Sequence, residues 1–302
     1  MFESTRQALS KFMEQSGKSQ RQLSKEIGLS TSVISQFLNG TYPGDNQEVA
    51  KTIEQYLSVS KERLNMVSSV TFYPDLYNTK ETLFCCYYSH RHNDISLISG
   101  DAGAGKTTAL KYYADTHTGV IFVTANACTT TATAILSLIC KKIGRQAPAR
   151  RAALMNTLVE QLSGSNRLII IDEADHLSLD ALQAVRNLND EAHCGIVLSG
   201  NDKIYRQMLS PRRGYEFEQI RTRIVVRKKV FNEYTVKEME TMFPALNQEY
   251  IGYLLKLACA ESLRTARKLY EVAAEVAAAQ NHKLTVKHLR DTQRQLLGEV
   301  ME

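Results

Sequence analysis

One stretch of eight residues, G-D-A-G-A-G-K-T at 100–107, constrains the fold of this chain more than any other. It follows an apolar run at 94–99, DISLIS, that predicts a short buried strand. It precedes TALKYYAD at 108–115, whose spacing predicts a helix. The glycines let the backbone wrap with its N–H groups pointing inward, and the helix directs its positive end at the same point. Strand, glycine-rich turn and helix in this order predict an anion site.

The pattern G-x-x-x-x-G-K-T is that of a nucleotide-binding P-loop. Its lysine, Lys106, would reach the β- and γ-phosphates, and the hydroxyl of Thr107 would ligate Mg²⁺. A glycine-rich turn that matches by chance is the alternative, but the complete pattern between a strand and a helix favours the P-loop. We therefore expect ATP and Mg²⁺ as ligands. The residues expected to bind the nucleotide are Gly100, Asp101, Ala102, Gly103, Ala104, Gly105, Lys106, Thr107 and Thr108.

A second motif supplies the carboxylates that such a site needs. Residues 167–173, RLIIIDE, combine four consecutive apolar residues, as a strand buried on both faces requires, with two acids at its end. Asp172 would hold Mg²⁺ through water, and Glu173 would polarise the attacking water. Alone this motif is a weak signal, but it becomes strong when it follows a P-loop. The apolar run GIVLS at 195–199 then places Asn201 between the two motifs, beside the γ-phosphate.

Strand-like runs alternate with helix-like stretches between these motifs, and GVIFVT at 119–124 is a further predicted strand. Such alternation predicts an α/β fold with a parallel sheet and a ligand site at the carboxyl ends of its strands. After Asn232 the pattern is helical only. We expect four parts: an all-α helix-turn-helix domain (1–60), a linker (61–75), the P-loop core (76–232) and a small all-α lid (233–302).

The N-terminal stretch 20–40 predicts a second kind of site. A short helix would end at Gly28, and Ser30 would cap a second helix that ends at Asn39 and Gly40. Two short helices joined by a tight glycine turn form a helix-turn-helix, and this one resembles the Cro/repressor-type family, whose second helix enters the major groove. Any small helical bundle with this spacing is the alternative. The residues expected to face DNA are Thr31, Ser32, Ser35 and Gln36.

Composition narrows the class of protein. The 302 residues are 43% hydrophobic and 23% charged, as in ordinary globular chains, and the length predicts more than one domain. No apolar run reaches the length of a membrane span, and the first residues lack the apolar core of a signal peptide, so we expect a cytoplasmic protein without membrane contacts. The six cysteines lack metal-binding spacing, which favours reduced thiols and no zinc site.

Basic residues are unevenly distributed, although the net charge is only +5. Residues 1–60 balance six basic against six acidic side chains, which argues against tight non-specific DNA binding by this part alone. Residues 203–230 carry nine Lys or Arg against two Glu, and residues 141–151 carry five without an acid. Such blocks often meet nucleic acid, although a solvated surface is the commoner explanation of any single block.

Five segments in order, GDAGAGKT, LIIIDEADHL, GIVLSGN, QIRTRIVV and ESLRTARKLYE, resemble the AAA+ ATPases over roughly residues 76–295. With a helix-turn-helix in front, the chain is most similar to the target-selecting ATPases of DNA transposition, the family typified by the B protein of phage Mu. The resemblance implies ATP hydrolysis to ADP and phosphate, and assembly of a homo-oligomeric ring or helical filament on double-stranded DNA with little sequence preference. It also implies a partner transposase in a bacterial cytoplasm.

The resemblance further implies roles for single residues. Asn201 would be sensor 1, and Arg264, in a lid helix, would be sensor 2. Arg223, with Arg221 as the second choice, would act on the nucleotide of the neighbouring subunit, and Arg223 has no evident carboxylate partner in the chain. The adenine contacts are poorly specified and are expected within residues 77–92.

In such an assembly, the segment between the second core strand and the Asp172 strand lies toward the central channel. Pro148 would end a helix and leave Arg150 and Arg151 on a loop that can face the axis. The basic residues of this segment that would hold DNA phosphates are Arg145, Arg150 and Arg151, with Lys141 and Lys142 beside them. A solvated helix end is the alternative.

Other functions share parts of this pattern. A helicase loader has the same ATPase core and also binds DNA. A nucleotide-regulated transcriptional regulator would likewise join a helix-turn-helix to an ATPase. The string D-E-A-D-H superficially matches DEAD-box helicases, but their other motifs are missing, so we interpret Asp175 and His176 as helix-start residues. No set of metal-binding carboxylates stands outside the ATP site, which disfavours a nuclease or a transposase.

Overall fold

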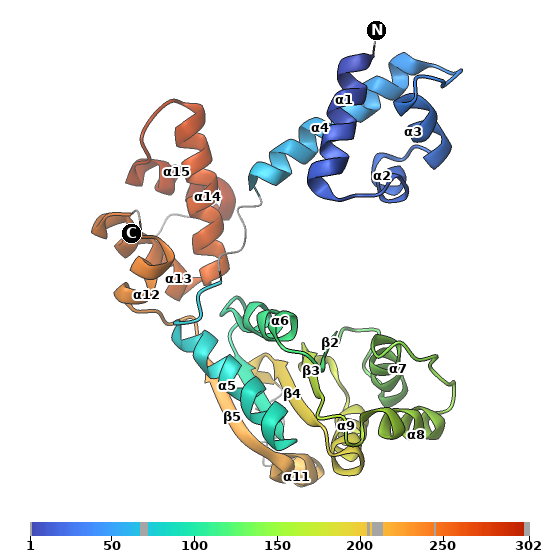
Figure 1. The fold of residues 1–302 in the computed structure, drawn as a ribbon. Coiled ribbons are helices and arrows are strands. Elements are labelled where there is room, and N and C mark those ends of the chain that lie inside the picture. Colours follow the sequence, from blue (N-terminus) through green and yellow to red (C-terminus); the bar gives the residue numbers. More distant parts are fainter. Residues whose placement is uncertain (1, 67–71, 204–205, 207–213, 245, 299–302) are drawn as a thin grey trace. The chain divides into compact units, whose positions relative to one another are not determined.

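The computed structural model describes residues 2–66, 72–203, 206, 214–244 and 246–298. It divides into two compact units, Met1–Thr71 and Phe72–Glu302, and each is described by itself. Figure 1 shows the helical N-terminal unit, and the second unit with its sheet and its separate group of helices. No described helix combines the length and the apolar character needed to cross a membrane.

The N-terminal unit contains four helices: α1 (Glu3–Ser16), α2 (Gln20–Ile27), α3 (Thr31–Leu38) and α4 (Asn46–Met66). Gly28 ends α2 in the left-handed conformation (φ 82°), and the side chain of Ser30 accepts from the Val33 amide to cap α3, as the sequence predicts. The cap of α2 was not predicted. Ser19 and Gln22 form a capping box there, each side chain bonding the other residue's backbone amide. A core that includes Leu23, Ile34 and Phe37 holds the helices together.

The expected linker at 61–75 is wrong in two respects. Helix α4 continues to Met66, so the helical pattern does not stop at residue 60. At the other end, Tyr73 and Leu76 pack into the core of the C-terminal helices, and the Tyr73 hydroxyl donates to the carbonyl of Met242 (2.9 Å). The division between compact units lies at residues 71 and 72. The sequence missed this because Tyr73 and Leu76 find their apolar partners far along the chain.

The second unit is built on a parallel five-stranded sheet of order β2-β3-β4-β1-β5, which confirms the α/β prediction. The strands are β1 (Ile95–Gly100), β2 (Val120–Thr124), β3 (Leu168–Asp172), β4 (Gly195–Gly200) and β5 (Ile224–Val230). The β1 strand lies next to β4, although much of the chain separates them, and their carboxyl ends meet at Ser99 and Gly200. This crossover brings the glycine-rich loop beside the end of β3.

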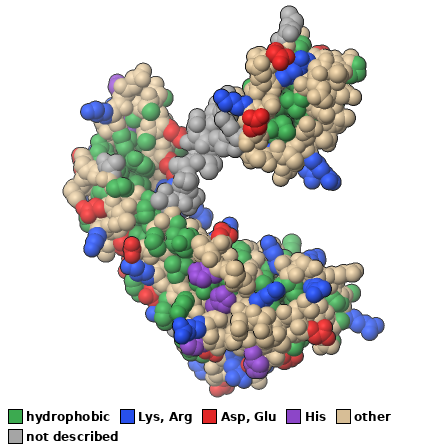
Figure 2. Space-filling model, in the orientation of Figure 1, with side chains coloured by type: hydrophobic (Ala, Val, Ile, Leu, Met, Phe, Trp, Pro, Cys, Tyr) green, Lys and Arg blue, Asp and Glu red, His purple; other side chains and the backbone are tan. Residues whose placement is uncertain are grey.

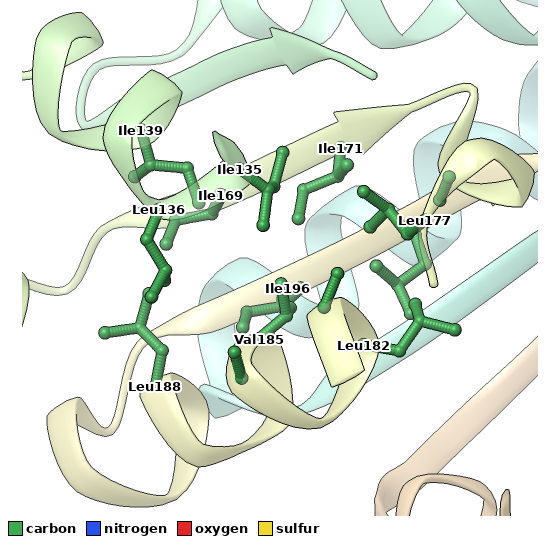
Figure 3. Close-up of a cluster of buried hydrophobic side chains, with 14 of the residues drawn as sticks. Ile135, Leu136, Ile139, Ile169, Ile171, Leu177, Leu182, Val185, Leu188 and Ile196 are labelled. Carbon is green, nitrogen blue, oxygen red and sulfur yellow. The ribbon is translucent and has the colours of Figure 1, made fainter. Parts of the chain in front are cut away.

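Helices cover both faces of the sheet (Figure 1). On one side are α5 (Tyr77–His92) and α6 (Lys106–Thr116), and on the other are α7 (Ala132–Lys142), α8 (Arg151–Leu162), α9 (Leu179–Ala192) and α11 (Gly214–Arg223). Side chains of β3 alternate between these layers: Ile169 and Ile171 contact the α7–α9 side, and Leu168 and Ile170 contact the α5–α6 side. Figure 3 shows the α7–α9 side, where helical leucines and isoleucines surround Ile169, Ile171 and Ile196. Burial on both faces explains the unbroken apolar run of β3.

Four further helices form the expected all-α lid: α12 (Val236–Met242), α13 (Gln248–Ala260), α14 (Leu263–Ala279) and α15 (Val286–Leu297). Their core includes Met239, Leu254 and Leu269. Thr285 caps α15 as predicted, in a capping box with His288.

Candidate functional site

The glycine-rich loop is held by close packing at its first glycine. Gly100 has φ 146°, and a Cβ there would lie 1.8 Å from the carbonyl oxygen of Val230, the last residue of β5. The Asp101 amide donates to this same carbonyl (3.1 Å). No residue with a side chain fits at position 100 unless β1 and β5 separate. Gly105, at φ 92°, directly precedes α6, and a Cβ there would meet open space, so its glycine serves the backbone conformation alone.

Lys106 begins α6, and its side chain folds back over the loop. Its ammonium donates to the carbonyls of Gly100 (3.0 Å) and Asp101 (2.8 Å). Burial lowers the pKa of Lys106 below its ordinary value, while the carboxylates of Asp172 and Glu173 act in the opposite direction. A buried ammonium near these acids is a strong electrostatic partner for an anion that enters the loop.

The two predicted motifs meet through their side chains. The hydroxyl of Thr107 donates to one carboxylate oxygen of Asp172 (2.7 Å), and the hydroxyl of Ser199 on β4 donates to the other (3.0 Å). Asp172 is 2% exposed, so both oxygens are directed by neighbours rather than by water. Hydroxyl and carboxylate oxygens are the ligands that Mg²⁺ prefers, and Thr107 and Asp172 therefore fit that ion. The sequence analysis missed Ser199, although its place at the tip of β4 could have indicated it.

Glu173 follows the buried strand β3 and is exposed. Its backbone is left-handed (φ 56°, ψ 36°), which costs a residue with a side chain roughly 1–2 kcal/mol. Strain of this kind concentrates at functional sites because the surrounding structure must hold it in place. The arrangement presents the carboxylate of Glu173 at the edge of the sheet where the P-loop lies.

Asn201, directly after β4, is bonded to the acid two residues after Glu173. Its backbone and side-chain nitrogens donate to the two carboxylate oxygens of Asp175 (3.1 and 2.7 Å). Our interpretation of Asp175 and His176 as helix-start residues is wrong. They lie in a short 3₁₀ turn, Ala174–His176, and α9 begins at Leu179 after the Ser178 cap. Asp175 orients the candidate sensor Asn201.

The lid reaches the glycine-rich loop through Ser262 and Asn232. A Cβ at Gly103 would lie 2.5 Å from the Cβ of Ser262, which caps α14, and 3.9 Å from the Cβ of Arg264. The Asn232 amide donates to Asp101 (2.9 Å), and its side-chain nitrogen donates to the carbonyls of Ala102 and Glu261 (3.1 Å each). Arg264 is exposed and stands next to the P-loop, as the sensor 2 assignment requires. The sequence analysis did not identify Asn232 as a contact residue.

In the N-terminal unit, α3 presents a polar face. Thr31, Ser32 and Gln36 are exposed and Ser35 is half-buried, while Ile34 and Phe37 point into the core. The helix follows α2 after the short turn at Gly28, the arrangement of a helix-turn-helix. Short polar side chains on an exposed second helix are suited to contacts with base edges and phosphates.

Comparison with known families and proteins agrees with both sites. The profile of the family described as "AAA domain" matches residues 89–208, and that of "Helix-turn-helix" matches residues 9–64. The ATP-dependent target DNA activator B of Escherichia phage Mu is 28% identical over 91% of this chain and 89% of its own length. The Mu-like prophage FluMu DNA transposition protein B of Haemophilus influenzae is 29% identical over 68% of this chain and 74% of its own. This chain is therefore similar to the B proteins of Mu and Mu-like phages over most of its length.

Among solved structures, this chain matches NtrX from Brucella abortus in complex with ATP. That match has a TM-score of 0.44 and 14% identity, and it covers 82% of this chain and 64% of NtrX.

The two candidate arginine fingers lie at the amino ends of the parallel strands, whereas the P-loop lies at the carboxyl end of β1. Arg223 ends α11 directly before β5, and Ile224 pairs with Ile95 while Val230 pairs with Gly100. Five residues of strand place Arg223 about 17 Å from the end where the P-loop begins. Arg221 lies half-buried in the same helical turn. The expectation that Arg223 lacks an acidic partner is wrong, because its Nε lies 3.1 Å from a carboxylate oxygen of Asp190.

The basic segment 141–151 joins α7 to α8. Its five basic side chains are exposed. The prediction that Pro148 ends a helix is wrong, because α7 already ends at Lys142, but Arg150 does lie on the loop between the two helices. However, Arg151 is the first residue of α8, not a loop residue, and its guanidinium pairs with Asp180 (2.8 Å). The expectation that no acid is near is therefore wrong. Arg145, on the same loop, donates to Gln161 (2.9 Å), whereas Arg150 has no side-chain partner among the described residues.

The second basic stretch, 203–230, lies partly outside the described residues, Arg212 and Arg213 included. Several of its described members pair with acids: Arg206 and Lys229 with Asp202, and Lys228 with Glu81. Figure 2 shows Lys and Arg dispersed among acidic and neutral side chains over the face it draws. On that face the chain thus carries its positive charge in small groups.

Proposed function

We propose that this protein is an ATPase that assembles on double-stranded DNA as a homo-oligomer, a helical filament or a ring, in the bacterial cytoplasm. It delivers target DNA to a partner transposase and stimulates it. The observation that carries the proposal is the bond between Thr107 and Asp172 beside Lys106, because it unites the two halves of a nucleotide site. The similarity to activator B along nearly the whole chain is the reason for proposing that this ATPase acts in transposition.

The nucleotide would bind along residues 100–108, with the Lys106 ammonium moving from the loop carbonyls to the β- and γ-phosphates. Thr107 and Asp172 would hold Mg²⁺, which when bound neutralises phosphate charge during transfer. Glu173 then accepts a proton from the attacking water, and Asn201, held by Asp175, orients that water. Arg264 approaches the phosphates from the lid.

Arg223 would complete the site of the neighbouring subunit. It lies too far from its own P-loop to act there, because it precedes the amino end of β5 while the P-loop follows the carboxyl end of the neighbouring strand β1. An arginine supplied across an interface stabilises the charge that develops on the transferred phosphoryl group. Hydrolysis would then require assembly, and Arg221, in the same turn, is the second choice.

DNA would be held in two ways. The exposed side of α3, with Thr31, Ser32, Ser35 and Gln36, would face the major groove. Arg150, with Arg145 and Arg151 beside it, would contact phosphates along the channel of the assembly without reading sequence. In this proposal residues 1–60 bind DNA, 76–232 form the ATPase core and 233–302 form the lid that responds to the nucleotide.

Electron microscopy with and without ATP and double-stranded DNA tests the proposal. We expect filaments or stacked rings that cover DNA of any sequence only when ATP is present. Discrete rings that form on a replicative helicase instead would favour the loader function, and a footprint confined to one operator would favour a transcriptional regulator. A strand-transfer assay with the cognate transposase then measures whether the ATP-bound assembly directs integration to the DNA that it covers.

A further inference from the structure

Asp190 contacts two arginines near the amino ends of the parallel strands, whereas the P-loop lies at their carboxyl ends. One carboxylate oxygen lies 3.1 Å from Nε of Arg223, and the other lies 3.3 Å from a terminal nitrogen of Arg186, one turn earlier on α9. Asp190 and Arg186 are 29% and 21% exposed, whereas Arg223 is 56% exposed. The carboxylate therefore holds the inner end of the Arg223 guanidinium, while the outer end faces solvent.

The position of Asp190 is itself fixed by its neighbour. Asn189 is buried, and its side-chain nitrogen donates to the carbonyls of Asn93 (2.8 Å) and Cys194 (2.7 Å). These bonds tie the end of α9 to the starts of β1 and β4, because Asn93 precedes β1 and Cys194 precedes β4. The bonds of Asn189 therefore hold Asp190 in place against the sheet. Arg223, by contrast, is the last residue of another helix, α11.

The ion pair leaves Arg223 able to act on an anion. Two guanidinium groups share one carboxylate, so the trio of Arg186, Asp190 and Arg223 retains one net positive charge. Only Nε of Arg223 is engaged within the described part of the chain, and its two terminal nitrogens remain open for a bidentate contact with phosphate oxygens. Beside it lies an open hollow of about 520 Å³, lined by Asp190, Asp94, His193 and Thr222 among others, which leaves room for a bound partner.

We propose that Asp190 is a positioning residue for catalysis in trans: it fixes the direction in which Arg223 is presented to the nucleotide of a second copy of this chain. This inference rests on the proposed role of Arg223 as the finger. A long side chain at a helix end otherwise samples many rotamers, and a fixed guanidinium reaches a transition state at a lower entropic cost. In this proposal Asp190 does not contact the nucleotide of either subunit and acts only through Arg223.

The first test compares DNA-stimulated ATP hydrolysis by Asp190→Asn and by the wild-type protein. We expect kcat to fall about 10- to 100-fold, as for a misplaced catalytic group, while KM for ATP and ATP binding stay unchanged because each P-loop is intact. Asp190→Glu, which keeps the charge, should recover part of the lost kcat. Glu271→Gln is the matched control. It breaks a similar ion pair one turn apart, with Arg267 on α14, at a similar exposure of 25%, and should leave kcat unchanged.

The decisive test mixes subunits. Arg223→Ala subunits have an intact pocket without a finger, and Lys106→Ala subunits have an intact finger without a pocket, so their mixture should regain activity. A mixture of Arg223→Ala with the double variant Lys106→Ala/Asp190→Asn should not regain activity. In that mixture the remaining Arg223 belongs to the double variant, where Asp190 no longer orients it.

The outcomes separate the two proposals. Full activity of Arg223→Ala alone would refute the finger and the positioning role together. Equal recovery in both mixtures would overturn the role of Asp190 and leave the finger intact. A rise in kcat for Asp190→Asn would also overturn it, because Asp190 would then restrain Arg223 instead of directing it.

Discussion

The hydroxyl of Thr107 donates a 2.7 Å hydrogen bond to the carboxylate of Asp172, although the two residues are 65 positions apart in the chain. One lies at the start of α6 and the other at the end of β3, and the parallel sheet brings both to its carboxyl edge. The roles of the groups around this bond can be separated by substitution.

Substitutions of Lys106 and Glu173 should affect different steps: the first should weaken ATP binding, and the second should slow ATP turnover. Lys106→Ala removes charge-assisted bonds to phosphate worth about 1.5–3 kcal/mol, so ATP affinity should fall roughly 10- to 100-fold. Glu173→Gln removes the base alone, so ATP should bind normally while turnover falls about 10²–10⁴-fold. Equilibrium binding of a fluorescent ATP analogue and single-turnover hydrolysis measure the two effects. Turnover at the wild-type rate in Glu173→Gln would remove Glu173 from its assigned role.

Glu173→Gly should stabilise the fold while abolishing hydrolysis. Glycine adopts the left-handed backbone of position 173 without strain, so the free energy of unfolding should rise by up to about 1 kcal/mol. Chemical denaturation of Glu173→Gly and Glu173→Gln gives the difference, because both lack the carboxylate. A glycine variant that is less stable than the glutamine variant would show that the backbone of residue 173 relaxes in solution.

Hydrolysis should require an arginine from a second subunit. Arg223→Ala should lower kcat about 10³–10⁵-fold, and a mixture with Lys106→Ala should recover part of it at interfaces that pair an intact pocket with an intact arginine. Rates measured across mixing ratios check this. If Arg223→Ala hydrolyses normally and no mixture changes the rate, the same series with Arg221→Ala identifies whether that residue is the finger.

The basic segment 141–151, between α7 and α8, should contribute salt-dependent DNA binding. Substituting Arg150→Ala together with Arg151→Ala should lower the slope of log K against log salt by about one unit per lost phosphate contact, equally for DNA of any sequence. The ion pair with Asp180 makes the share of Arg151 smaller than that of Arg150. Arg294→Ala, at an exposed arginine of α15 outside both basic stretches, is the control. An unchanged slope would exclude these arginines and direct attention to residues 203–230.

The helix-turn-helix should read sequence independently of the ATPase. Gln36→Ala should remove about 1–3 kcal/mol of discrimination between a preferred site and a mismatched one, with little change in ATP turnover. Competition binding between selected and scrambled duplexes measures this discrimination. Equal discrimination by the wild-type protein and the variant would place Gln36 outside the groove.

The fold and the nucleotide site were predictable because their signals are local or strongly periodic. The strand, loop and helix around Lys106, the buried run before Asp172 and the caps at Ser30 and Thr285 depend on residues close in sequence. Side-chain pairs between distant elements were not predictable. Arg223 with Asp190 joins two helices, and no periodicity in either helix indicates the partner.

The same reason explains two other misses. Asp175 was read as the start of a helix, but its carboxylate is occupied by Asn201 from the tip of another strand. Residues 61–66 lack a clear apolar pattern, yet they continue α4, whose earlier residues pack against α1 and α2. Tertiary contacts thus extend a helix beyond the point where its own sequence supports one.

The Asn232 side chain forms a weak hydrogen-bonded connection between the lid and the P-loop. It donates to the carbonyl of Ala102 on the loop side and to that of Glu261 on the lid side, so a rotation of the lid breaks the bonding on one side only, at a net cost of about 0.5–1.5 kcal/mol per bond. A connection of that strength favours one position of the lid and still breaks at thermal energies. We therefore expect that a bound phosphate group, whose charge-assisted hydrogen bonds are worth about 1.5–3 kcal/mol each, can shift the position of the lid.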